Sequence, residues 1–145
     1  MAANEESDQE AEQAVAQLRY LQNIYSQQYE MIESEIATYS LALSAINKNI
    51  DMLEDPDKIN NKEMLLNGEG GTYIVAKIKP VEQVITYVGA GYLVEKSLED
   101  AKAFLNDNRK KQEENLRRLS EERLKIEKEL VSISYKLSAY NQQQV

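Results

Sequence analysis

A heptad pattern occupies the first third of the sequence, from Val15 to Leu53. Apolar or aromatic residues recur there at alternating intervals of three and four, with Gln22 as the exception. One core set is Val15, Gln22, Tyr29, Ile36, Leu43 and Ile50, and the other is Leu18, Tyr25, Ile32, Tyr39, Ile46 and Leu53. A sustained period of 3.5 residues is typical of a helix in a coiled coil. Pro56 predicts the end of this helix, because proline removes a backbone donor and constrains the residue before it.

A second pattern of the same kind occupies the last third of the sequence. Its firm positions are Leu116, Leu119, Ile126, Leu130, Ile133, Leu137 and Tyr140. Arg123 interrupts this seam, and Arg109 and Gln112 make its first half more polar. Ser97 is suited to cap the helix, with Glu99 in the first turn against the helix dipole. We therefore expect a second coiled-coil helix from about residue 98 to the end of the chain.

The region between the two helices predicts four short strands. The predicted strands lie at 63–67, 72–78, 84–88 and 92–95, separated by turn residues, and 72–78 is the segment rich in β-branched and aromatic residues. Gly89 and Gly91 predict a tight turn between the last two strands, because glycine tolerates positive φ. Two isolated hairpins are marginal in water, so we expect them to pair with other chains. The residues expected to form that oligomeric core are Ile74, Ile78, Ile85, Tyr87, Val88 and Leu93.

These elements predict an α+β fold, in which a long antiparallel two-helix coiled coil is joined by two β-hairpins. The expected divisions are a helix at 1–54, with 1–12 frayed or disordered, a hairpin insert at 55–97, and a helix at 98–145. The predicted register pairs residues whose numbers add up to 148, such as Leu18 with Leu130. That register sets Arg123 against the ring of Tyr25, where a cation–π contact would stabilise it. A neighbouring register, adding up to 155, would set Arg123 against Ile32 with no compensating partner.

Composition and charge exclude several classes of function. The net charge of −8 argues against nucleic-acid binding, which needs a basic face. Cysteine and histidine are both absent, so we expect no catalytic residues, no metal ligands and no cofactor. The glycine-rich segment 68–71 lacks the lysine of a phosphate-binding loop and is better explained as a hairpin turn. No apolar run is long enough for a membrane span, and we expect a cytoplasmic protein that binds neither membrane nor nucleic acid.

Apolar residues near the two ends of the chain are candidates for contact with other proteins. They are Val15, Leu18, Leu21 and Ile24 from the first helix and Ile133, Leu137 and Tyr140 from the second. Tyr20, Leu21 and Ile24 lie beside the seam and widen its apolar stripe beyond what a two-stranded coil needs. Two interpretations remain open at this point. These side chains form a surface that contacts other proteins, or they are scattered surface residues or the interface with a third helix.

The order of helix, two hairpins and returning helix resembles the alpha-type subunit of prefoldin, a hexameric co-chaperone of archaea and eukaryotes. The resemblance rests on Val88-Gly89-Ala90-Gly91, on Glu95-Lys96 and on Leu98-Glu99-Asp100-Ala101. The strand segment 70–78 also fits the strand that precedes 84–88 in that family. Two hairpins are similar to the alpha type, because the beta type has one.

The resemblance implies a double β-barrel platform built from two alpha-type and four beta-type subunits. Coiled coils extend from the platform in that family and hold non-native polypeptides between their tips without ATP. The family passes these clients to a group II chaperonin. We therefore expect a non-enzymatic holdase subunit. The alternative is a structural coiled-coil spacer or adaptor with a β oligomerisation head.

Overall fold

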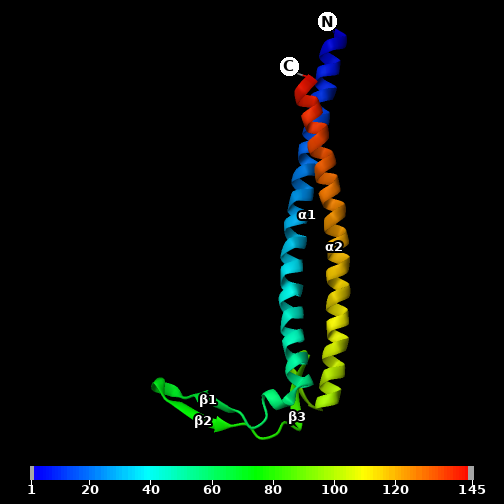
Figure 1. Cartoon of the computed structure of the whole chain (residues 1–145). Helices are drawn as coiled ribbons and strands as arrows, with labels where there is room; N and C mark the ends of the chain where they lie inside the picture. The colour runs from blue at the N-terminus through cyan, green and yellow to red at the C-terminus, as the bar shows by residue number, and fades with distance from the viewer. Residues whose placement is uncertain (1, 144–145) are drawn as a thin grey trace. The chain divides into compact units, whose positions relative to one another are not determined.

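The structure, a computed structural model, describes residues 2–143, with side chains described for residues 5–142 (Figure 1). The main elements in chain order are α1 (Ala2–Glu54), β1 (Glu63–Asn67), β2 (Tyr73–Lys77), β3 (Gln83–Gly89), β4 (Tyr92–Ser97) and α2 (Leu98–Gln143). The predicted order of two long helices around two hairpins is confirmed. Both helices contribute to two compact units. The coil unit comprises the described residues up to 40 and from 115 onward, and the hairpin unit comprises residues 41–114.

Helix α1 begins well before Val15, where the heptad pattern starts. It ends at Glu54, shortly before Pro56, as the sequence predicts. It includes residues 2–12, for which the sequence predicts a frayed or disordered segment. This segment is rich in alanine and glutamate, which are strong helix formers, and extending an existing helix needs no new nucleus. At the other end, the backbone N–H of Lys58 donates to the carbonyl of Asp55 at 3.1 Å, in a short turn that begins at Pro56.

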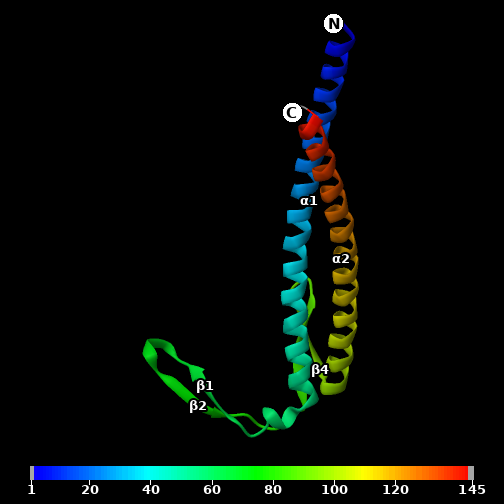
Figure 2. The same cartoon turned by 45° about the horizontal axis from the view of Figure 1, so that its top comes forward.

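In the coil unit, α1 and α2 are antiparallel, and Figures 1 and 2 show the two chain ends at the same end of this unit. The buried side chains here are Leu119 and Ile133, both from α2. Among the described residues, three polar contacts cross from one helix to the other. Gln22 contacts Ser134, Tyr29 contacts Glu127, and Arg123 contacts Glu33. The residue numbers of each pair add up to 156.

The predicted register is therefore wrong by about one heptad. The observed contacts agree with the neighbouring register, because Arg123 contacts Glu33, the residue after Ile32, and does not lie beside Tyr25. The prediction failed because it allowed Arg123 only an aromatic ring as a partner. The structure supplies a carboxylate from the turn of α1 that contains Ile32, since Arg123 Nη1 lies 2.8 Å from Glu33 Oε1.

Both predicted hairpins are present as separate antiparallel pairs. In the first, β1 pairs with β2 so that Leu65 faces Val75 and Leu66 faces Ile74. In the second, β3 pairs with β4 so that Ile85 faces Glu95 and Thr86 faces Val94. The register of the second hairpin shifts between Tyr87 and Gly89, which is a bulge immediately before the turn.

The turn of the second hairpin uses three consecutive residues with positive φ. The φ angles are 108° at Gly89, 49° at Ala90 and 82° at Gly91. Glycine adopts these angles without a Cβ penalty, which explains the predicted role of both glycines. The backbone N–H of Gly91 also donates to the hydroxyl of Tyr87 at 3.3 Å.

The core of the hairpin unit lies where the two helices meet the second hairpin. Ile50, Leu53 and Ala101 are its buried residues. Helix α2 begins with the predicted cap, because the backbone N–H of Asp100 donates to Ser97 Oγ at 3.1 Å. Lys96 Nζ also lies 5.2 Å from the centre of the Phe104 ring, a cation–π contact that ties β4 to the first turns of α2.

Candidate functional site

The first hairpin of the hairpin unit is apolar on both faces. Pairing places Leu66 and Ile74 on one face and Leu65 and Val75 on the other, since neighbouring residues in a strand point to opposite sides. All four side chains are exposed. Figure 2 shows this hairpin as a bare two-stranded ribbon. A ribbon with two uncovered apolar faces is suited to lie inside a larger sheet assembly.

The second hairpin has one covered face and one open face. Val84 and Thr86 are half-buried against α1 and α2, where they line a hollow with Ile46, Leu53 and Phe104. Ile85, Tyr87 and Leu93 point to the opposite face and are exposed, and Ile85 and Tyr87 also line part of this hollow.

The residues predicted for the oligomeric core all lie on these two hairpins, within β2, β3 and β4 or, for Ile78, just after β2. Ile74, Ile85, Tyr87, Leu93 and Val88 are exposed in the single chain. Ile78, just after β2, is half-buried.

The apolar residues predicted to contact other proteins, called the tip residues below, all lie in the coil unit, but they are not equally accessible. Ile133 is buried, at 4% exposure, so its side chain packs within the coil. Leu21 is exposed at 42%. The remaining members are half-buried, with Ile24 beside the seam and the others on it: Val15, Leu18, Leu137 and Tyr140.

Two of these residues come together from opposite ends of the sequence. Val15 and Tyr140 line one hollow of about 350 Å³, together with Glu12 and Arg19. The antiparallel coil therefore brings apolar groups from both chain ends to one place. Leu21 and Ile133 are not part of this hollow.

Several exposed apolar residues of the coil unit were not predicted as site residues. They are Met31, Leu124, Val131 and Tyr135, each at least half exposed. The sequence contains a weak signal for three of them. Leu124, Val131 and Tyr135 recur at intervals of seven and four, outside the seam positions. Such spacing places them on one face of α2.

Four polar residues form a cluster across the coil. The hydroxyl of Tyr29 donates to Glu127 Oε1 at 3.1 Å, and Arg123 Nη1 donates to Glu33 Oε1 at 2.8 Å. Arg123 Nε lies 3.9 Å from Glu127 Oε1 and has no hydrogen-bond partner of its own. The hydrogen bond to Glu127 raises the pKa of Tyr29, and partial burial and the charge of Glu33 add to this. The hydrogen bond to Glu33 raises the pKa of Arg123. The cluster ties the two helices together on one flank.

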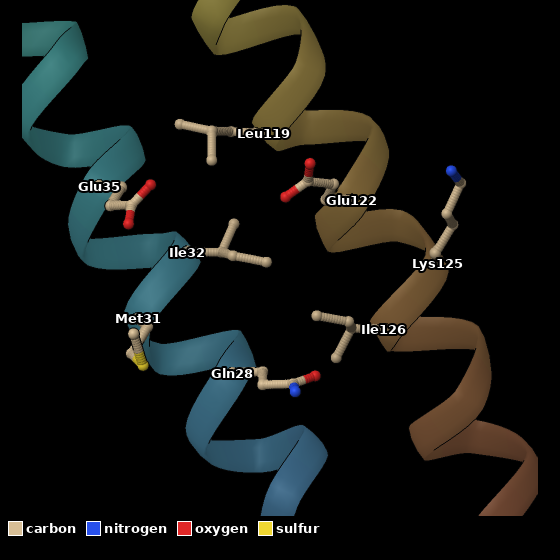
Figure 3. Close-up of a pocket in the computed structure, with 8 residues that line it drawn as sticks. All are labelled: Gln28, Met31, Ile32, Glu35, Leu119, Glu122, Lys125 and Ile126. Atoms are coloured by element: carbon tan, nitrogen blue, oxygen red, sulfur yellow. The ribbon is translucent and has the colours of Figure 1, made fainter.

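The other flank of the coil carries an open hollow (Figure 3). Ile32, Leu119 and Ile126 point into the gap between the helices, and the exposed Met31 lies on the outer side of α1. The hollow encloses about 370 Å³. Glu35 and Glu122 stand at its edge, and Lys125 points away from the gap.

Neither a metal-binding cluster nor a membrane-spanning helix is found among the described residues. Among them no group of three or more acidic side chains is arranged to hold a metal ion. Within the same residues, no helix combines the length and the apolarity that a membrane span requires.

Comparison with known proteins agrees with this architecture. The family model for prefoldin subunits matches residues 25–143. The alpha subunit of prefoldin from Methanocorpusculum labreanum is 29% identical over 99% of both chains. The alpha subunit from Thermofilum pendens is 38% identical over 66% of each chain, and human prefoldin subunit 5 is 36% identical over 61% of this chain and 58% of its own length.

A solved structure shares the fold. The filamentous prefoldin from Methanocaldococcus jannaschii, determined by cryo-EM, aligns with a TM-score of 0.51 at 19% identity, covering 81% of this chain and 93% of that one. The family model spans both helices and both hairpins, and the curated relatives include several alpha subunits. The chain therefore belongs to the prefoldin family, as a subunit of the alpha type.

Proposed function

We propose that this chain is a holdase subunit of a hexamer that contains two alpha-type and four beta-type chains. It binds non-native polypeptides without ATP, keeps them from aggregating and delivers them to a group II chaperonin in the cytoplasm. The hairpins join it to the other subunits, and the coil unit contacts the client. The observation that carries this proposal is the distribution of exposed apolar side chains in the coil unit, away from any seam.

A holdase must bind many unfolded chains weakly. Accessible apolar groups on a helical support meet that need better than a shaped pocket, because they impose little on the sequence of the client. Tyr20 and Tyr135 are 66% and 78% exposed, and Leu21, next to Tyr20 in the sequence, is exposed as well. A spacer protein has no need of such groups, since they add a risk of aggregation and no stability. The exposed tyrosines and their apolar neighbours therefore favour the holdase over the structural spacer.

The assembly half of the proposal rests on the hairpins. The first hairpin has two bare apolar faces, and the second presents Ile85, Tyr87 and Leu93 to solvent. Burying apolar surface contributes about 25 cal/mol per Å², so strands of other subunits would be strongly favoured as a cover. Mixing this chain with a beta-type prefoldin subunit should give a complex with the mass of two alpha and four beta chains. A long homopolymer under the same conditions would contradict the hexamer and favour a filament.

The client half is tested by removing exposed apolar groups without disturbing the coil. The change is Tyr20→Ser with Leu21→Ser in the assembled complex, and the measurement is light scattering after dilution of an unfolded client. We expect weaker suppression of aggregation, because both side chains are exposed and neither is a seam residue.

The matched control is Leu41→Ser in the hairpin unit, a similarly exposed apolar residue at 74%. It should leave suppression unchanged. Equal suppression by the tip variant and the control would argue against client binding at this end of the coil unit.

A further inference from the structure

The two flanks of the coil unit differ in how the helices are joined. Residues two apart in a helix are about 200° apart around its axis, so Tyr29 and Met31 lie on nearly opposite sides of α1. The same holds for Glu127 and Lys125 on α2. Tyr29 and Glu127 are hydrogen-bonded, which closes their flank. Across the hollow at Met31, no hydrogen bond or ion pair joins the helices within the described part of the chain.

The open flank is apolar at its base and large enough for side chains of another molecule. Ile32 and Ile126 are half-buried there, and the exposed Met31 lies at the outer rim of the hollow on α1. A volume of about 370 Å³ lies at the lower end of what ligand pockets occupy. It can therefore take one or two apolar side chains from an extended or helical segment, and not a folded domain.

The charge at the edge of the hollow is negative. Neither Glu35 nor Glu122 forms an ion pair among the described residues, and Figure 3 shows Lys125 turned away from the gap. Two free carboxylates complement a segment that carries lysine or arginine next to its apolar residues.

A second hollow on α2 provides the contrast. It is lined by Leu124, Val131, Glu127 and Lys128. Its carboxylate, Glu127, already accepts a hydrogen bond from Tyr29, and its lysine would repel a basic segment.

The hollow at Met31 also continues the apolar stripe that begins at the tip residues Leu21 and Ile24. Leu21, Ile24, Gln28 and Met31 follow one another at intervals of three, four and three, which places them along one face of α1. A polypeptide bound at Leu21 can thus extend along this face to Met31.

From these observations we propose that the hollow formed by Met31, Ile32, Leu119 and Ile126 holds segments of non-native polypeptides in which apolar residues are flanked by lysine or arginine. This inference rests on the proposed holdase function and assigns a client preference to it. The acidic edge selects basic segments, and the apolar base accepts their neighbouring side chains.

The test uses two fluorescent peptides with the same leucine residues, one flanked by lysine and the other by glutamate. Their affinity for the full-length chain is measured by anisotropy. The lysine peptide should bind about tenfold more tightly at low salt, because two weak exposed ion pairs add to the apolar contact, and added salt should reduce the difference. Equal affinity for both peptides would overturn the proposal.

Variants locate the binding. Met31→Ser, and separately Glu35→Gln with Glu122→Gln, should each weaken the lysine peptide by about three- to tenfold, in line with the loss of an apolar contact or of two exposed ion pairs. Leu41→Ser in the hairpin unit, an apolar residue of similar exposure, is the control and should change nothing. The glutamine variant is isosteric, so it tests the proposal even if the serine variant folds poorly. If the glutamine variant bound the lysine peptide with wild-type affinity, Glu35 and Glu122 would not select basic segments, and the proposal would be overturned.

The same proteins separate this inference from the proposed function. If the Tyr20→Ser, Leu21→Ser complex loses suppression of aggregation while the glutamine variant keeps its affinity for the lysine peptide, only the client preference fails. If the wild-type complex neither suppresses aggregation nor binds either peptide, the holdase function itself fails.

Discussion

Arg123 Nη1 of α2 lies 2.8 Å from Glu33 Oε1 of α1, in the middle of the coil unit. Arg123 interrupts the seam, and such an interruption is tolerated only where a partner satisfies the charge. Glu33 supplies that partner in one alignment of the helices. Sliding the helices by a heptad would separate the pair, so the contact helps to specify the alignment, in the way that a single polar seam residue specifies register in other coiled coils.

The register itself is open to a direct test, because the chain has no native cysteine. Cysteines introduced at Gln22 and Ser134 should be joined rapidly by a short thiol crosslinker, since the two side chains are hydrogen-bonded neighbours at 3.5 Å. Cysteines at Val15 and Ser134 serve as the control, because they would face each other only if the helices slid by one heptad. Faster crosslinking of the control pair, measured by gel shift, would refute the observed register.

Alkaline pH should weaken the coil unit through Tyr29. Its pKa is raised in the folded chain, above the ordinary value of 10.0, chiefly by the hydrogen bond that its hydroxyl donates to Glu127. A group with a raised pKa stabilises the fold fully below its unfolded pKa, and this contribution is lost as pH rises through the folded pKa.

Urea unfolding between pH 8 and pH 11 should therefore show a smaller loss of stability at high pH in Tyr29→Phe than in the wild type. Tyr25→Phe is the matched control from the neighbouring seam position and should follow the wild type. The same slope in all three proteins would contradict a role for the Tyr29 hydroxyl.

The start of α2 should depend on Ser97. Its Oγ accepts the backbone N–H of Asp100 at 3.1 Å, so Ser97→Ala leaves that donor without its cap. The expected cost is about 1 kcal/mol in the free energy of unfolding, which is typical for loss of an N-cap. Urea unfolding measures the difference, and Ser97→Thr should recover most of it. A loss of stability in the threonine variant as large as in the alanine variant would exclude capping as the cause.

Assembly should fail when the open face of the second hairpin receives a charge. Ile85→Asp would place an unpaired carboxylate in the proposed subunit interface, which costs several kcal/mol. We expect loss of the large complex on mixing with a beta-type subunit, while circular dichroism retains most of the helix signal. Leu41→Asp is the control, with similar exposure but on α1. A full-size complex from Ile85→Asp would remove this face from the interface.

Local patterns in the sequence predicted most of the fold. The β1 strand matches the predicted segment 63–67, and Ser97 caps α2 as its position before the acidic first turn suggested. Gly89 and Gly91 adopt the positive φ angles expected of them. These features are decided within a few residues of the chain, by propensity, capping and turn geometry.

Features that depend on distant pairs were not predictable in the same way. The register required knowing that Arg123 meets Glu33, and a heptad pattern alone is satisfied by every shift of seven residues. Ile133 is buried and Leu21 is exposed, and this difference likewise depends on how α1 and α2 pack. The hollow at Met31 arises from side chains of both helices, so no single stretch of sequence indicates it.

The central claim, that the coil ends hold clients, is tested most directly by shortening both ends of the chain together. Deleting residues 1–21 and 135–145 would leave the contact between Gln22 and Ser134 as the last layer of the coil and would remove Tyr20, Leu21 and Tyr135. The shortened chain should still assemble with its beta-type partner, because the hairpins are intact. We predict that this complex suppresses aggregation of a diluted unfolded client much less than the full-length complex at equal concentration. Undiminished suppression by a correctly assembled, shortened complex would contradict the account and assign client holding to the partner subunits.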